Sequence, residues 1–380
     1  MEKNLLLPAL PGEMLAHLET PCIVIDMDQT RKNIRKMQDM ADGAGCALRP
    51  HIKTHKMGLF ARMQIEAGAK GITCAKISEA EVMAAAGIDD IFVAYPLAGE
   101  FRFRRAAELG KKLRRLILGV DSIPGARALN AAAAEAGVRF EVRMEIDTGA
   151  RRTGISQERM IDLARYITEQ PCLDLTGIYT FKSLVYRGAA TTDAALAAQE
   201  EGEYMAAVAE RLAEAGIPVT DISAGSTPTA AGVAGTELVT EIRPGTYIFN
   251  DYMLYREGAA STGEISAFFY ATVVSTPEKG YAVIDGGTKT FPMDIMLNTP
   301  PYHYPSYAVV DGREDLVLTR MNEEHGMLTA LKGDTGLEPG QILRLIPIHI
   351  CTAINMQNRV YLYDNGILTV QNVDARGMLA

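Results

Sequence analysis

The sequence predicts an α/β fold: a (β/α)8 barrel of the TIM type with a second, all-β domain at the C-terminal end. Three observations support this prediction. Short apolar runs alternate with helix-like segments from about residue 20 to residue 250, which is typical of a parallel sheet covered by helices. After about residue 260 the runs often alternate with polar residues and are separated by Gly, Pro, Asp and Asn. A length of 380 residues is enough for two such domains.

The first part of the chain contains the runs expected to form the barrel. They are almost continuously apolar, as strands buried on both faces are, and eight or nine strand–helix units fit a closed barrel. Helical spacing occurs around Leu109, in residues 126–136 and, over the longest stretch, in residues 190–215. A doubly wound open sheet is the alternative, but no Gly-x-Gly-x-x-Gly turn follows an early strand. The expected strands are residues 22–26, 46–51, 71–75, 91–94, 115–120, 140–146, 173–179, 219–224 and 240–243.

The last part of the chain reads as the all-β domain. A polar, glycine-containing linker near residues 255–263 separates the two parts, so we expect a barrel domain over residues 20–258 and a β domain over residues 259–380. Whether residues 1–19 pack on the β domain is left open. The expected strands are residues 266–275, 281–285, 308–310, 316–318, 342–346 and 360–363.

Composition narrows the class of protein. A net charge of −9 disfavours nucleic acid and anionic membranes as partners. Five scattered cysteines do not form a disulfide framework. The apolar run at the N-terminus is too short for a secretory signal, and no run reaches the roughly 18 residues that a membrane helix needs. We therefore expect a soluble, reduced, cytoplasmic protein.

The densest polar cluster follows the second expected strand. Residues 49–56 contain two lysines, two histidines and an arginine directly after an apolar run. Chemistry in a (β/α) barrel gathers where strands end. Cations crowded around Lys53 would favour its neutral amine, the form that attacks a carbonyl carbon. The alternative is a solvated loop with a basic patch.

Polar residues also follow three later strands. Residues 147–154 carry two adjacent arginines, residues 223–229 read Ser-Ala-Gly-Ser-Thr-Pro-Thr, and residues 243–247 read Arg-Pro-Gly-Thr-Tyr. A glycine followed by N–H and hydroxyl groups suits a phosphate, although the same turn commonly caps a helix. A reactive lysine, a phosphate cup and arginines at one barrel face together suggest pyridoxal phosphate as cofactor.

The β domain carries a candidate metal motif. His349 and Cys351 stand two residues apart in an expected strand, so their side chains would point to the same side. Imidazole with thiolate suits a divalent metal, zinc above all. The alternative is a buried cysteine near a satisfied histidine. No group of candidate ligands surrounds His325 in the sequence, so we expect it to have a structural role or to contact a metal ligand without binding the metal itself.

These motifs together resemble those of the fold-type III (alanine-racemase-like) pyridoxal-phosphate enzymes, and within them the D-threonine aldolase and D-serine dehydratase family. The similarity covers nearly the whole chain, and its most specific part is Arg-Pro-His-Ile-Lys-Thr-His-Lys at residues 49–56. The resemblance implies that Lys53 forms the Schiff base with the cofactor and acts as the catalytic residue. It also implies the remaining site residues: Arg152 at the phenolic oxygen, Gly225, Ser226, Thr227 and Tyr247 at the phosphate, and His349 and Cys351 as ligands of zinc, or alternatively manganese or magnesium.

The resemblance further implies the activity. We expect a lyase that acts on a D-β-hydroxy-amino acid by β-elimination, giving a 2-oxo acid and ammonia. The alternatives are aldol cleavage to glycine and an aldehyde, an amino-acid racemase, and a cofactor carrier without turnover. Cysteine rather than aspartate at position 351 favours elimination. The resemblance also implies a homodimer.

One stretch departs from the family pattern. Many members have a histidine-rich segment after the strand that ends near Tyr179, whereas this chain has no histidine there. If that histidine handles the substrate hydroxyl, the role would pass to Lys182, Tyr186 or a metal-bound water, or be absent.

Overall fold

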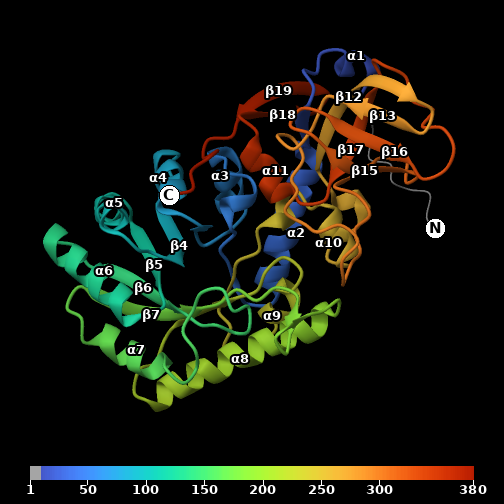
Figure 1. The fold of residues 1–380 in the computed structure, drawn as a ribbon. Helices are drawn as coiled ribbons and strands as arrows, with labels where there is room; N and C mark the ends of the chain where they lie inside the picture. Colours follow the sequence, from blue (N-terminus) through green and yellow to red (C-terminus); the bar gives the residue numbers. More distant parts are fainter. Residues whose placement is uncertain (1–9) are drawn as a thin grey trace. The chain divides into compact units, whose positions relative to one another are not determined.

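The computed structural model describes residues 10–380, which form two compact units. The barrel unit comprises Ile34–Gly245 with Met378–Ala380, and the β unit comprises residues up to Asn33 with Thr246–Gly377 (Figure 1). This division differs from the expected boundary at residue 258, because the chain passes from one unit to the other at Thr246 and the β unit includes an N-terminal segment.

In the described residues, eight parallel strands form the sheet of the barrel unit in the order β2-β11-β10-β7-β6-β5-β4-β3. A parallel bridge between His51 and Thr73 joins the two ends of this series, so the sheet closes on itself. The predicted barrel is therefore confirmed, and each of its strands falls within or beside one of the predicted apolar runs. The strands are β2 (Ala47–Leu48), β3 (Ile72–Cys74), β4 (Asp90–Pro96), β5 (Arg115–Val120), β6 (Phe140–Glu145), β7 (Leu173–Tyr179), β10 (Asp221–Ala224) and β11 (Glu241–Ile242).

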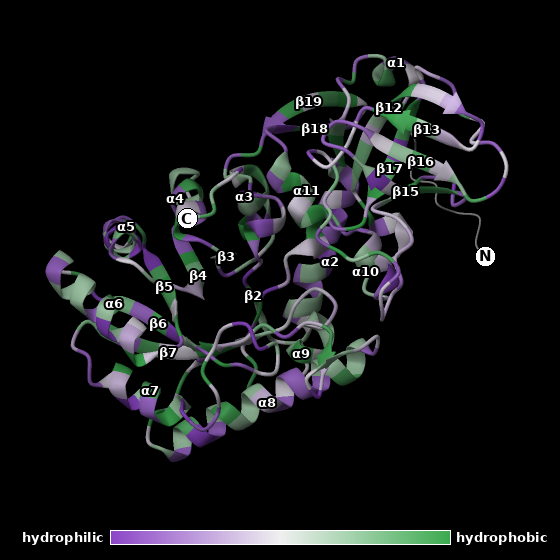
Figure 2. Ribbon diagram, in the orientation of Figure 1, coloured by the Kyte–Doolittle hydropathy of each residue, from purple (hydrophilic) through white to green (hydrophobic). Residues whose placement is uncertain are grey.

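Helices cover the outside of the barrel strands (Figure 1). The helix α6 shows why they form where they do: Ser122 accepts a hydrogen bond from the Gly125 N–H at its start, and Gly137 ends it with a φ of 67°. The longest helix, α8, presents both apolar and polar residues along its length (Figure 2), and most of the residues that it buries, such as Met205, Val208 and Leu212, are apolar. The helices are α2 (Met27–Gly43, which begins in the β unit), η1 (Ile52–Thr54), α3 (Gly58–Glu66), α4 (Ile77–Ala85), α5 (Glu100–Gly110), α6 (Ile123–Ala136), α7 (Met160–Thr168), α8 (Ala194–Glu214) and α9 (Ala230–Ala234), and the short strands β8 (Val185–Tyr186) and β9 (Ala189–Ala190) form a hairpin before α8.

The interior of the barrel contains a charged network that the apolar pattern of the strands does not predict. Arg49, Arg143 and Glu241 are fully buried. The Glu241 carboxylate accepts from Arg49 Nε at 2.8 Å and from a terminal nitrogen of Arg143 at 2.5 Å. Arg49 also reaches Asp90 at 2.5 Å. These groups are buried at the cost of their hydration, which is tolerable because each charge has an opposite partner.

The β unit is built on a nine-stranded sheet in the described residues, ordered β13-β16-β15-β14-β17-β12-β1-β18-β19, and an additional β12–β13 pairing closes part of it into a ring. β12 can take part in both because it is long and its register with β13 is interrupted by bulges. The predicted all-β character is confirmed, with β16 and β19 in addition to the expected strands. The strands are β1 (Cys22–Asp26), β12 (Ala267–Glu278), β13 (Tyr281–Ile284), β14 (Ala308–Val310), β15 (Leu316–Met321), β16 (Gly326–Ala330), β17 (Ile342–Pro347), β18 (Arg359–Asp364) and β19 (Ile367–Asn372), and the helices are α1 (Gly12–Leu15), η2 (Thr246–Ile248), α10 (Tyr252–Arg256), η3 (Thr262–Glu264) and α11 (Ile350–Met356).

The first expected strand, residues 22–26, is not part of the barrel. It forms β1, which pairs antiparallel with β12 and parallel with β18 in the β unit. Its apolar run is buried in the β unit, as a barrel strand would also be, so periodicity could not distinguish the two sheets. Leu10 and Leu18 pack into the same hydrophobic cluster of the β unit as Cys22, whereas residues 1–9 lie outside the described residues.

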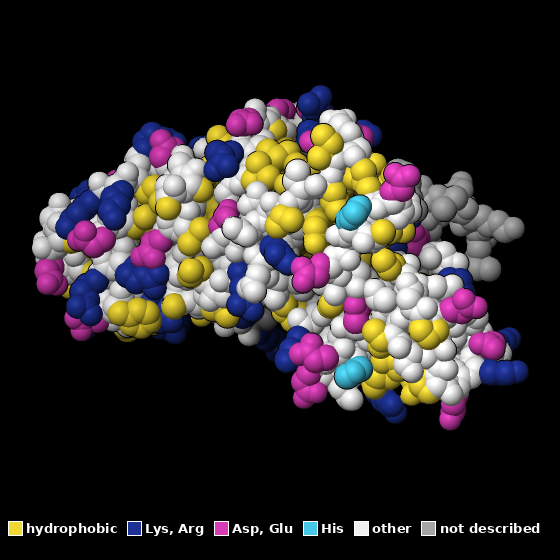
Figure 3. All heavy atoms as spheres, turned by 90° about the horizontal axis from the view of Figure 1, so that it is seen from above, with side chains coloured by type: hydrophobic (Ala, Val, Ile, Leu, Met, Phe, Trp, Pro, Cys, Tyr) yellow, Lys and Arg dark blue, Asp and Glu magenta, His cyan; other side chains and the backbone are white. Residues whose placement is uncertain are grey.

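The described helices do not include one with both the length and the apolar composition needed to cross a bilayer. All five cysteines lie in the described residues and none forms a disulfide, as predicted. On the face seen in Figure 3, basic and acidic side chains are interspersed.

Candidate active site

Lys53 follows β2, the first strand of the barrel along the chain. β2 leads to His51, which bridges to β3, and the next three residues form the single turn η1 that contains Lys53. The Lys53 N–H donates to His51 Nδ1 at 3.3 Å, which holds the turn against the strand end. The lysine is therefore presented on a short, locally fixed turn, and its side chain is half-buried.

Lys53 and Arg152 both lie against the ring of Phe181. Lys53 Nζ is 5.3 Å from the ring centroid and Arg152 Cζ is 4.7 Å from it. A cation over an aromatic face is attracted to the ring electrons, so Phe181 holds both charged groups near it. Two of the predicted site residues, one after β2 and one after β6, thus meet at Phe181 in the segment after β7.

This end of the barrel is strongly electropositive. The pKa of His51 is well below its usual value, because of burial first and then because of the nearby charges of Lys53, Arg243, His55 and Arg152. A ring in such surroundings stays neutral near pH 7 and accepts through Nδ1, as the hydrogen bond from Lys53 requires. The positive charges of Lys53, Arg152 and Arg243 near His51 suit an anionic ligand.

Glu145 is a member of this region that the sequence analysis did not identify. It ends β6 and accepts from Thr153 Oγ1 at 2.7 Å and from the Tyr179 hydroxyl at 3.0 Å. Burial raises the pKa of Glu145, while these two hydrogen bonds and the charge of Arg152 oppose the increase. Its position at the end of a strand was the available signal, but the side-chain partners follow later in the chain.

The loop after β10, predicted as the phosphate cup, is held by a buried carboxylate. Gly225 has a φ of 80°, and its N–H donates to Glu201 Oε1 at 3.1 Å. The Ser226 N–H donates to Thr229 Oγ1 at 3.0 Å, and that hydroxyl donates to Glu201 Oε2 at 3.1 Å. The backbone N–H groups of Gly225 and Ser226 therefore have acceptors within the protein. Thr227 is half-buried.

Lys182, one candidate for the role of the absent histidine, is buried and pairs with Glu200 of α8. Glu200 also accepts from the Arg187 N–H with both oxygens at 3.1 Å. The ammonium group of Lys182 is thus used to attach the segment around the β8–β9 hairpin to α8. Tyr186 lies in that hairpin, half-buried and beneath Arg187.

Tyr247 belongs to η2, at the start of the second chain segment of the β unit, and is buried. The relation of its hydroxyl to the phosphate loop stays a prediction.

The expectation that His349 and Cys351 stand on a strand is wrong. β17 ends at Pro347, His349 is the N-cap of α11, and Cys351 lies in the first turn of that helix. Asp251 determines this start, because its buried carboxylate accepts from the Ile350 N–H at 3.0 Å and from the Leu254 N–H at 3.0 Å. The two side chains are nevertheless adjacent, since a hydrogen bond joins His349 and Cys351.

Further polar groups surround His349 in the β unit. Its Nδ1 lies 2.5 Å from Asp294 Oδ2, and Thr352 Oγ1 donates to the same oxygen at 2.8 Å. Cys351 Sγ is 3.4 Å from Thr246 Oγ1. Burial lowers the pKa of His349, but Cys351 and Asp294 outweigh it and hold this pKa well above its usual value.

His349 and Cys351 alone do not complete the coordination of a metal ion. No group of three or more His, Cys, Asp and Glu side chains arranged to hold a metal is found among the described residues. Imidazole next to a thiol is a chemically suitable pair, and a metal held by two protein ligands keeps positions for water or substrate. His325 is exposed in the turn between β15 and β16.

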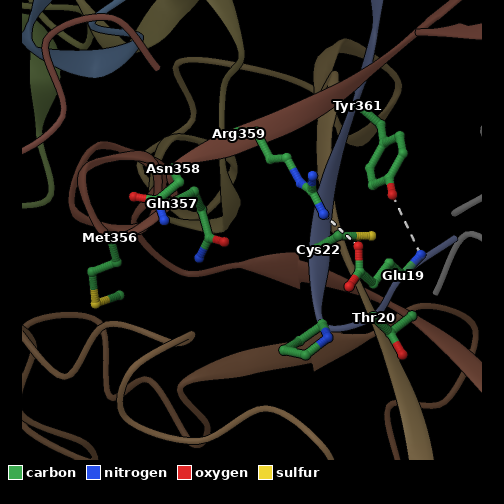
Figure 4. A pocket seen from close by; sticks show the side chains of 9 residues that line it. Glu19, Thr20, Cys22, Met356, Gln357, Asn358, Arg359 and Tyr361 are labelled. Carbon is green, nitrogen blue, oxygen red and sulfur yellow. Dashed lines mark hydrogen bonds and ion pairs between the residues drawn. The ribbon is translucent and has the colours of Figure 1, made fainter. Parts of the chain in front are cut away.

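A separate pocket of about 330 Å³ lies in the β unit and contains none of the predicted site residues (Figure 4). Glu19 and Arg359 form an ion pair across it. Burial, with the nearby charges of Asp285 and Glu19, raises the pKa of Cys22 in its wall to about 12, so this thiol is not a nucleophile.

Comparison with known proteins agrees with this architecture. Residues 25–253 match the alanine racemase N-terminal domain, and residues 266–363 match a serine dehydratase domain. A D-threonine aldolase from Arthrobacter sp is 30% identical over 97% of this chain and 96% of its own length. A D-threo-3-hydroxyaspartate dehydratase from Delftia sp. (strain HT23) is 35% identical over 89% of this chain and 92% of its own length. The solved structure of the Delftia sp. HT23 dehydratase has a TM-score of 0.86 at 32% identity and covers 94% of this chain and 98% of that chain.

The chain is therefore a member of the alanine-racemase-like class, with the barrel and β unit that define it. Within that class it belongs to the family of lyases that includes D-threonine aldolase and D-threo-3-hydroxyaspartate dehydratase. The predicted family and the prediction of a lyase acting on D-hydroxy-amino acids are confirmed.

Proposed function

We propose that this protein is a pyridoxal-phosphate- and metal-dependent dehydratase that converts a D-3-hydroxy-amino acid into a 2-oxo acid and ammonia. The observation that carries the proposal is the pairing of Lys53 and Arg152 on Phe181 at the end of the barrel strands. A lysine amine can bind an aldehyde covalently, and a neighbouring arginine supplies the positive charge that an anionic cofactor needs. The proposal of dehydration rests on Cys351 and on the similarity to the Delftia dehydratase.

The residues of the barrel unit suit pyridoxal phosphate. When bound, this cofactor supplies an electron sink for negative charge at the substrate Cα. Lys53 would attach it covalently, and Arg152 would lie at its phenolic oxygen. Gly225, Ser226 and Thr227, with Tyr247, would receive the phosphate. The N–H groups of Gly225 and Ser226 have internal acceptors, and the Ser226 hydroxyl lies 3.2 Å from Thr229 Oγ1.

Lys53 would also act as the general base. Once released by the substrate amine, its amine can take the Cα proton. His51, which precedes Lys53 on the same turn, is held neutral by burial and by the surrounding cations. Phe181 keeps the ammonium that forms on Lys53 over a ring face, where it is stabilised.

His349 and Cys351 would hold the divalent metal, which supplies Lewis acidity at the substrate hydroxyl. The mixed imidazole and thiolate pair favours zinc over manganese or magnesium. A solved structure of a related D-threo-3-hydroxyaspartate dehydratase with one cysteine replaced by alanine is described as a metal-free form, which supports a metal function for a cysteine in that protein.

The second candidate is the aldol reaction, favoured by the similarity to D-threonine aldolase over 97% of this chain. The two reactions differ in the fate of the hydroxyl group. Its departure gives a 2-oxo acid and ammonia, whereas its deprotonation breaks the Cα–Cβ bond and gives glycine and an aldehyde.

The experiment is product analysis with D-serine, D-threonine and D-3-hydroxyaspartate, in the presence of pyridoxal phosphate and zinc. We expect a 2-oxo acid and ammonia, and no reaction of the L-enantiomers. Glycine with an aldehyde would establish the aldolase instead, and the L-enantiomer as sole product would establish a racemase. Lys53→Ala should lose the visible absorbance of the bound cofactor and the activity, whereas Lys111→Ala, at the exposed end of α5, should keep both.

Homodimer formation and a cytoplasmic location stay predictions. Sedimentation equilibrium of the purified protein tests the first.

A further inference from the structure

We propose that Asp294 is a positioning residue of the metal centre, which fixes the orientation and tautomer of His349. The inference rests on the proposed function, because it assumes that His349 binds the metal. Asp294 comes from the segment between β13 and β14, 55 positions before His349 in the chain, and its carboxylate Oδ2 lies 2.5 Å from His349 Nδ1.

The geometry decides which imidazole nitrogen is available. A carboxylate only accepts hydrogen bonds when ionised, so the short contact with Oδ2 requires the proton on Nδ1. In the neutral ring the lone pair is then on Nε2, which is the nitrogen that can bind a metal. Cys351 adjoins His349, as expected if both bind one ion.

A second donor fixes the carboxylate itself. Thr352 Oγ1 donates to Asp294 Oδ2 at 2.8 Å, from the same helix α11 that contains Cys351. Asp294 thus links the N-cap of α11 to its first turn and restrains the residues on both sides of Cys351. Carboxylates placed in this way behind a ligating histidine make it more basic and restrict its rotation.

The test uses zinc alone as the probe. Zinc affinity is measured by calorimetric titration of the pyridoxal-phosphate-loaded protein after chelation. Asp294→Ala should weaken zinc binding about 10- to 100-fold. Asp294→Asn, which can still accept from Nδ1–H but lacks the charge, should lie between Asp294→Ala and the unmodified protein. Asp315→Ala removes a carboxylate that is paired with Arg313 in the same unit and should bind zinc normally.

Cobalt separates a positioning role from a purely structural one. Bound cobalt reports its ligand field, so we expect the d–d bands of Asp294→Asn to differ from those of the unmodified protein and those of Asp315→Ala to match them. Unmodified zinc affinity and cobalt bands in both Asp294 variants, with weakened binding in His349→Ala, would overturn this inference alone. Unchanged zinc binding in His349→Ala and Cys351→Ala would overturn the proposed metal site and this inference together.

Discussion

At the scale of single residues, the loop after β10 depends on one glycine. Gly225 has a φ of 80°, a region that non-glycine residues rarely adopt, and a Cβ there would come within 3.3 Å of Ile242 Cγ2. Its N–H also holds Glu201. A change at this position therefore acts on both the backbone and the buried carboxylate beneath the loop.

Replacing Gly225 with alanine should lower the free energy of unfolding by about 1–3 kcal/mol and weaken cofactor binding. Gly216→Ala is the matched control, because Gly216 has a φ of 79° but open space around a Cβ. We expect the control to lose stability without losing affinity for pyridoxal phosphate. Urea unfolding and cofactor titration measure the two effects, and equal cofactor affinity in both variants would contradict the assignment of this loop.

The residues of the site that could be predicted from the sequence are those in the segments that follow a strand. Lys53 lies in the segment after β2 and Arg152 in the segment after β6, and the barrel brings both to Phe181. Glu201 and Asp294 could not be predicted, because neither lies in a recognisable motif. The partner of Glu201 is 24 positions away in the chain, and that of Asp294 is 55 positions away.

At the scale of elements, the β8–β9 hairpin is attached to α8 by a buried ion pair with unequal partners. The Lys182 side chain is 1% exposed, whereas that of Glu200 is 29% exposed and retains the Arg187 N–H as a donor. Removing the carboxylate leaves a buried cation without its partner, while removing the lysine leaves a partly solvated carboxylate that is still hydrogen-bonded.

Glu200→Ala should therefore destabilise the protein by about 3–5 kcal/mol, and Lys182→Met by about 1 kcal/mol. Chemical unfolding of both variants measures the difference. A larger loss for Lys182→Met would mean that Lys182 has a role beyond this ion pair, such as the substrate contact considered for the absent histidine.

The prediction that residues 349–351 lie in a strand was wrong, and this error also concerns a single element. A His-x-Cys spacing places both side chains on one side of a strand, but Asp251 accepts from the Ile350 N–H and starts a helix there. Short apolar segments do not distinguish strand from helix, and the deciding carboxylate lies 99 positions earlier in the chain.

At the scale of the whole molecule, the charged network inside the barrel makes stability depend on acid pH. Burial raises the pKa of Glu241, but Arg143 and Arg49 outweigh it and hold this pKa well below its usual value. Glu241 therefore takes up its proton at a lower pH in the folded protein than in the unfolded chain. The stabilisation is complete above the unfolded pKa of about 4.3 and is lost as the pH falls from there towards the folded pKa.

Glu241→Gln should accordingly cost about 3–5 kcal/mol at pH 7, because buried arginines lose a charged partner. The difference from the unmodified protein should shrink steadily below about pH 4. Urea unfolding at a series of pH values measures this, with the exposed Glu210→Gln as control. A constant difference down to pH 3 would show that Glu241 is not the group that titrates.

The architecture as a whole was largely predictable, since strand and helix alternation and the later change to short strands are both visible in the sequence. The placement of β1 was not, because its partners Phe269 and Leu362 are far away in the chain and its apolar pattern suits either sheet.

That placement has a consequence for synthesis. β1 leaves the ribosome ahead of every barrel strand, yet the two neighbours that it separates, β12 and β18, emerge only after the barrel strands are complete. The nascent chain must therefore keep an apolar N-terminal segment unpaired while a whole barrel is translated. During that interval the segment exposes apolar surface and an unpaired strand edge, the features that chaperones protect.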